Sequence, residues 1–79
     1  MSEGTDWSGR HKKMFTVFRH AMELERQAQK MFRQAISLAE DPTFRKVLEG
    51  FLADEERHER ELVARYNALR KQVGAEPGD

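Results

Sequence analysis

The sequence has no cysteine, only two prolines, and no apolar run near the roughly 20 residues that span a bilayer. The missing thiols exclude disulfide bonds, thiolate zinc sites and thiol catalysis. Residues 1–10 contain no apolar stretch, which excludes a signal peptide there. We therefore expect a cytoplasmic protein, either free or inside a cytoplasmic assembly, with no membrane partner.

Excess charge of either sign is also missing, because 14 basic residues balance 14 acidic ones. This balance gives no general attraction to nucleic acid, so we expect no nucleic-acid partner. A chain of 79 residues buries little core, and natural domains of this size usually depend on disulfides, metal or association. With disulfides excluded, metal, a partner or both must stabilise the fold.

Breaks in the helical pattern define three segments. Glycines and small polar residues predict a flexible N-terminal segment over residues 1–8, and Gly74, Pro77 and Gly78 predict a flexible tail over residues 74–79. Residues 9–73 between them hold one strong break, at Asp41-Pro42, where Asp41 suits an N-cap and Pro42 the first helical position. Two helices are predicted, from about residue 8 or 9 to 39 and from 42 to 73.

Apolar residues repeat every seven positions in both helical segments. The first helix carries the rows Met14, Ala21, Ala28, Ala35 and Val17, Leu24, Met31, Leu38, with a third row of Phe18, Phe32 and Ala39; the second carries Phe44, Leu48, Phe51, Leu62 and Leu69. The short link allows only an antiparallel hairpin. Because two helices cannot bury such broad faces on each other, we expect an all-α fold in which two hairpins dimerise into a four-helix bundle.

Three ionisable residues interrupt these apolar faces: Glu25 in the first helix, and Glu55 and His58 in the second. In an antiparallel hairpin, residues equidistant from the turn lie side by side. Positions 25 and 55 average to 40, and positions 25 and 58 to between 41 and 42, so all three lie at one level, roughly 20 Å from the turn. Two copies would supply four carboxylates and two imidazoles, the ligand set of a di-iron or di-manganese bundle; zinc is a less selective alternative.

Simpler interpretations remain open for the same residues. A Glu-rich helix produces Glu-x-x-His by chance, and a Glu at the edge of an apolar stripe often extends to water. Glu59 lies near the stripe edge and is either surface charge or a spare ligand.

Because an imidazole must be neutral to bind metal, binding at His58 should weaken below about pH 6.

At these residues the sequence resembles the ferritin-like superfamily, especially rubrerythrins and encapsulated ferritins. The resemblance rests on Glu25-Arg26-Gln27-Ala28-Gln29-Lys30-Met31-Phe32, on Asp54-Glu55-Glu56-Arg57-His58, and on their 30-residue separation, over roughly residues 15–69. It implies a di-iron ferroxidase, with two iron ions per dimer, Glu55 and His58 as terminal ligands and Glu25 as a bridging or mobile ligand. It also implies a homodimer or higher homo-oligomer, and an encapsulin shell as a partner.

The sequence departs from these relatives at the residues near Glu25. Leu24 and Gln27 stand where encapsulated ferritins carry further carboxylates, and Phe32 stands where relatives often have tyrosine. The residues from 74 to 79 hold no apolar peptide of the kind that docks cargo to a shell.

Three functions fit this sequence. The first is a ferroxidase that oxidises Fe(II) to Fe(III) for iron storage or detoxification, with Glu25, Glu55 and His58 as catalytic metal ligands. The second is a rubrerythrin-like peroxide reductase, although a chain without cysteine has no rubredoxin-like iron site to supply electrons. The third is a non-enzymic helical oligomerisation module with a buried polar network.

Overall fold

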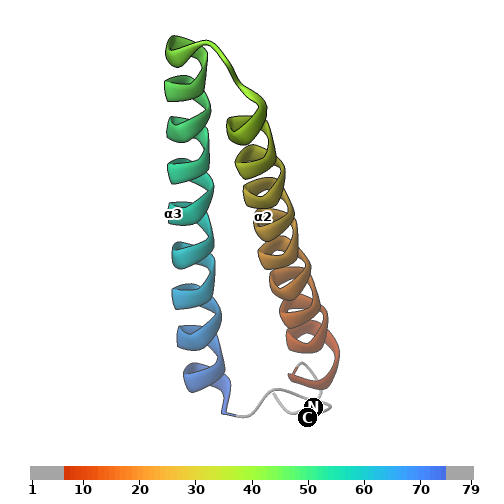
Figure 1. The fold of residues 1–79 in the computed structure, drawn as a ribbon. Helices are drawn as coiled ribbons and strands as arrows, with labels where there is room; N and C mark the ends of the chain where they lie inside the picture. The colour runs from red at the N-terminus through yellow and green to blue at the C-terminus, as the bar shows by residue number, and fades with distance from the viewer. Residues whose placement is uncertain (1–6, 75–79) are drawn as a thin grey trace.

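Two long antiparallel helices make up almost all of the computed structural model, which describes residues 7–74 (Figure 1). Helix α2 covers Lys12–Leu38 and helix α3 covers Pro42–Val73, while a five-residue π-helix, η1, precedes them at Trp7–His11. No strand occurs within residues 7–74. The predicted all-α hairpin is therefore confirmed, as a rod with extents of 60 × 17 × 16 Å.

The link between the helices is fixed by hydrogen bonds at both helix ends. The Asp41 side chain accepts from the Phe44 backbone N–H at 3.0 Å, which caps α3 directly before Pro42. The Arg45 guanidinium donates to the Ala39 carbonyl at 2.6 Å, at the end of α2, where carbonyls lack partners within the helix. The turn is therefore tight, and α3 begins at the predicted residue.

The other helix ends differ in how closely they follow the sequence. Helix α3 ends at Val73 as predicted, and Gly74 adopts a φ of 96° that favours glycine. Helix α2 ends at Leu38, one residue before the predicted limit. It begins at Lys12, later than predicted, and the wider π-helical turn η1 precedes it. That turn contains Gly9, which has low helix propensity, and His11 makes no side-chain cap hydrogen bond. The predicted end segments, residues 1–8 and 74–79, fall largely outside the described residues, so their flexibility stays a prediction.

The contact between the helices is built on a row that the heptad analysis did not single out. Phe15, Met22 and Gln29 lie seven residues apart and are the buried residues of α2, with Phe15 fully buried. Leu48 is the buried apolar residue of α3. The Phe15 ring also packs edge-on against Tyr66, with centroids 5.4 Å apart. The hairpin core is therefore narrow.

Much apolar surface remains open to solvent. Within residues 9–72, eight large apolar side chains are at least 40% exposed: Met14, Val17, Leu24, Met31, Leu38, Phe44, Val47 and Phe51. The row from Val17 to Leu38 begins two positions after the buried row, and so lies about 160° round the helix from it. One hairpin therefore leaves a broad apolar face uncovered, as the sequence predicts, and patches of this kind mark association surfaces.

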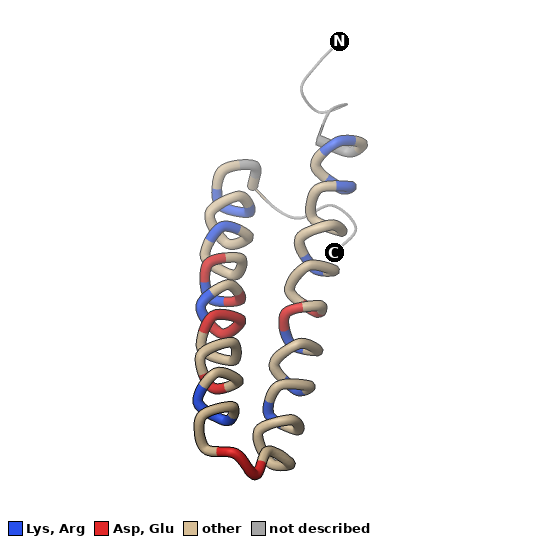
Figure 2. The backbone as a smooth tube through the Cα atoms, turned by 90° about the horizontal axis from the view of Figure 1, so that it is seen from above, with Lys and Arg blue, Asp and Glu red and all other residues tan. Residues whose placement is uncertain are grey.

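Charged residues of both signs are interleaved along α3, whereas the acidic residues of α2 are confined to Glu23 and Glu25 (Figure 2). Two inter-helix ion pairs are Arg26–Glu59 at 2.9 Å and Arg33–Glu56 at 3.2 Å. Within the described residues, neither helix has a stretch apolar enough to cross a lipid bilayer.

Replacing Asp41 should measure how far the cap stabilises the hairpin. We expect Asp41→Ala to lower the free energy of unfolding by about 1 kcal/mol, because the Phe44 N–H loses its acceptor. Asp41→Ser, which keeps a capping oxygen, should lose much less. Urea unfolding followed by circular dichroism compares the two variants, and equal losses would show that the cap contributes nothing.

Candidate metal centre

Glu25, Glu55 and His58 converge midway along the hairpin, one from α2 and two from α3. The His58 Nδ1 atom lies 3.6 Å from Glu55 Oε1 and 3.9 Å from Glu25 Oε1. The side chains of Glu25 and Glu55 are 23% and 26% exposed, and that of His58 is 44% exposed. The structure therefore brings together the three residues that the sequence places at one level.

The spacing of the three groups suits a shared cation. One ligand atom from each residue lies within 4.8 Å of the other two. Two donors that are each about 2.1 Å from one ion lie at most about 4.2 Å apart. Both distances from His58 Nδ1 fall inside that limit. Carboxylate oxygens combined with an imidazole nitrogen suit iron, manganese and zinc.

The electrostatics of Glu25 favour the arrival of a positive charge. The pKa of Glu25 is raised above its usual 4.5, first because it can share a proton with the Glu55 carboxyl and then because burial disfavours its charged form. Negative charge on Glu55 acts in the same direction, and His58 opposes it. Glu25 Oε1 is buried without a hydrogen-bond partner. A cation would supply the missing partner and offset the repulsion between the carboxylates.

Aromatic and polar side chains border the three residues on either side. One shallow hollow is lined by Phe32, Phe51, Asp54, Glu55 and His58, and a second by Glu25, His58, Glu61, Leu62 and Arg65. The Phe32 and Phe51 rings pack with centroids 5.6 Å apart. Phe32 therefore has an apolar packing role in the hairpin.

Sequence reasoning missed a polar network beside this cluster. Gln29 is 6% exposed, and its amide donates to Glu59 Oε1 at 2.6 Å; the Arg26 Nε donates to Glu59 Oε2 at 2.9 Å. The pKa of Glu59 is lowered, chiefly by the Gln29 hydrogen bond and against the opposing effect of burial. Glu59 is not among the three converging ligands. The seven-residue spacing of Phe15, Met22 and Gln29 was the signal that could have revealed this network.

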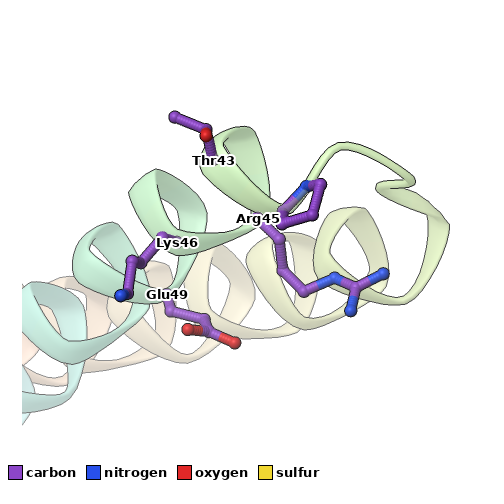
Figure 3. Close-up of a pocket in the computed structure, with 5 residues that line it drawn as sticks. Thr43, Arg45, Lys46 and Glu49 are labelled. Atoms are coloured by element: carbon purple, nitrogen blue, oxygen red, sulfur yellow. The ribbon is translucent and has the colours of Figure 1, made fainter.

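A separate hollow at the start of α3 is unrelated to this cluster. It is lined by Pro42, Thr43, Arg45, Lys46 and Glu49, which all belong to the first two turns of one helix (Figure 3). All five residues are exposed, and the Arg45 side chain is engaged with the Ala39 carbonyl. The cluster of Glu25, Glu55 and His58 is therefore the candidate functional site.

Comparison with known proteins agrees with this geometry. The family described as the ferritin-like domain matches residues 4–71, which include both helices up to the last turn of α3 and all three converging residues. Searches of curated proteins and of solved structures returned no match. Since the family match covers most of the chain, the protein belongs to the ferritin-like domain family.

Proposed function

We propose that two copies of this hairpin pair into a four-helix bundle and that the bundle oxidises Fe(II) to Fe(III). The observation that carries the proposal is the convergence of Glu25, Glu55 and His58 at one level of the hairpin. The match to the ferritin-like domain supports it, because that match includes all three residues.

The exposed apolar face supports the dimer. Glu25 and Glu55 lie on the helices beside apolar side chains such as Leu24 and Phe51, which are 49% and 47% exposed. Covering these side chains with a second copy would remove them from water. This burial stabilises the pair by about 25 cal/mol for each Å² of apolar surface. The same pairing would bring two sets of ligands together, giving four carboxylates and two imidazoles around two metal ions.

Fe(II) is the substrate in this proposal, with dioxygen as the oxidant. Two Fe(II) ions each give one electron to dioxygen, which takes up two protons and leaves as hydrogen peroxide. In the assignment implied by the family resemblance, Glu55 and His58 would be terminal ligands, and Glu25 would be a bridging or mobile ligand. Because the pKa of Glu25 is raised, protons compete with the ion for this carboxyl up to a higher pH than they do for an ordinary glutamate.

Iron storage in quantity would need more than a dimer. A lone four-helix bundle encloses no mineral-sized space, so storage requires a cage formed by higher oligomers or by a partner shell. An encapsulin shell, implied by the resemblance to encapsulated ferritins, is our proposal for that partner and for the protein's location. Detoxification by oxidation alone would need no cage.

Oxygen consumption tests the proposed reaction directly. We expect Glu25→Ala to slow Fe(II)-dependent oxygen uptake roughly tenfold or more, because the variant loses a ligand from each half of the site. Glu49→Ala, which removes an exposed carboxylate near the turn, should react like the wild type. Equal rates for all three proteins would reject the site. Replacing dioxygen with hydrogen peroxide separates a ferroxidase from a peroxide reductase.

Metal binding should stabilise the fold in a pH-dependent way. The folded chain holds the Glu25 proton to a higher pH than the unfolded chain does, so this group favours folding below about pH 4.5 and its contribution is lost as pH rises through the raised pKa. A divalent cation replaces that proton. At 100 times its Kd, Mn(II) should add about 2.7 kcal/mol at pH 7, and much less at pH 4.5.

Thermal melting with and without Mn(II) at the two pH values measures this difference. For a domain of this size the expected shift at pH 7 is about 10 °C or more. The Glu25→Ala variant should show little shift at either pH. A shift of equal size at pH 4.5 and 7, or none at pH 7 in the wild type, would contradict binding at these carboxylates.

A further inference from the structure

Glu59 is a third carboxylate beside the metal centre, and both of its oxygens are held by α2. Gln29 Nε2 donates to Oε1 at 2.6 Å, and Arg26 Nε donates to Oε2 at 2.9 Å. The Glu59 side chain is only 22% exposed, so water replaces these partners poorly. Hydrogen bonds to a carboxylate are among the stronger ones in proteins.

This carboxylate lies close to the ligands. Glu59 directly follows His58 and is one helical turn from Glu55, and its two partners, Arg26 and Gln29, lie one and four residues after Glu25. Its negative charge contributes to the raised pKa of Glu25, which places the two carboxylates within electrostatic reach. Nevertheless, Glu59 is not one of the three residues whose ligand atoms converge.

Gln29 occupies a position where an apolar side chain would be expected. It continues the buried row of Phe15 and Met22, and it is the one buried polar residue within residues 9–74. Burying an amide is costly unless both of its ends are hydrogen-bonded. Here Nε2 donates to Glu59, and Oε1 accepts from Arg33 at 3.4 Å. A polar network that is satisfied in this way fixes the orientation of its members.

We propose that Gln29 is a positioning residue that holds the Glu59 carboxylate out of the metal ligand set; this rests on the proposed metal-binding function. Each chain then offers two carboxylates and one imidazole rather than three carboxylates and one imidazole. The coordination positions that Glu59 would fill are left for the oxidant, and reactive metal sites need such open positions. Releasing Glu59 should therefore tighten metal binding and slow oxidation.

Co(II) is a suitable probe, because its visible absorption weakens as its coordination number rises from four or five to six. In the Gln29→Leu variant, Glu59 keeps only its bond to Arg26, and its released oxygen Oε1 should bind the ion. The Co(II) absorption should therefore fall, and Co(II) should bind about tenfold more tightly. The double variant Gln29→Leu/Glu59→Ala has no carboxylate to release, and its spectrum should return to that of the wild type. Gln27→Leu, the same change at an exposed position on α2, should leave the spectrum unchanged.

The outcomes separate three interpretations. If Gln29→Leu changes the melting temperature while its Co(II) spectrum stays that of the wild type, Gln29 is merely structural and the proposal is overturned. If the wild type binds no Co(II), the metal-binding function fails, and this proposal with it. If Gln29→Leu does not fold, Gln29→Met removes the same hydrogen bond to Glu59 with a side chain close to glutamine in length. An unchanged spectrum in that variant would also overturn the proposal.

Discussion

The repulsion between the Glu25 and Glu55 carboxylates is the constraint on which the proposed dimer and its metal centre depend. In a single hairpin it is tolerated because both side chains keep about a quarter of their surface exposed to water, and it contributes to the raised pKa of Glu25. Covering the apolar face with a second copy would remove that water, and the charges would then need a cation. Dimerisation and metal binding are therefore coupled in the proposed bundle, and each favours the other.

Local signals were enough to predict the hairpin and the level of Glu25, Glu55 and His58. Asp41 and Pro42 mark the start of α3, and the link is so short that the helices can only be antiparallel. Once the turn is placed, the register follows, and Glu25 must lie opposite Glu55 and His58. The prediction succeeded because it used the distance of each residue from the turn, which does not depend on how the helices are rotated.

The rotation of α2 against α3 was harder to predict, because α2 has apolar residues over more of its circumference than α3 can cover. The row that α3 covers includes Gln29, a residue type typical of surfaces, so the row did not stand out as core. The two residues that hold Glu59 were missed for the same reason. Neither Arg26 nor Gln29 is apolar, and only their positions next to α3 show that they hold this carboxylate.

Native mass spectrometry of the protein with Fe(II), in the absence of oxygen, tests the central claim most directly. The coupling of association to metal binding predicts a species of two chains and two iron ions, whose population falls when iron is removed. In Glu25→Ala this species should lose its iron. One iron bound by a single chain, or a dimer whose population and iron content are unaffected by Glu25→Ala, would contradict a metal centre shared between two copies.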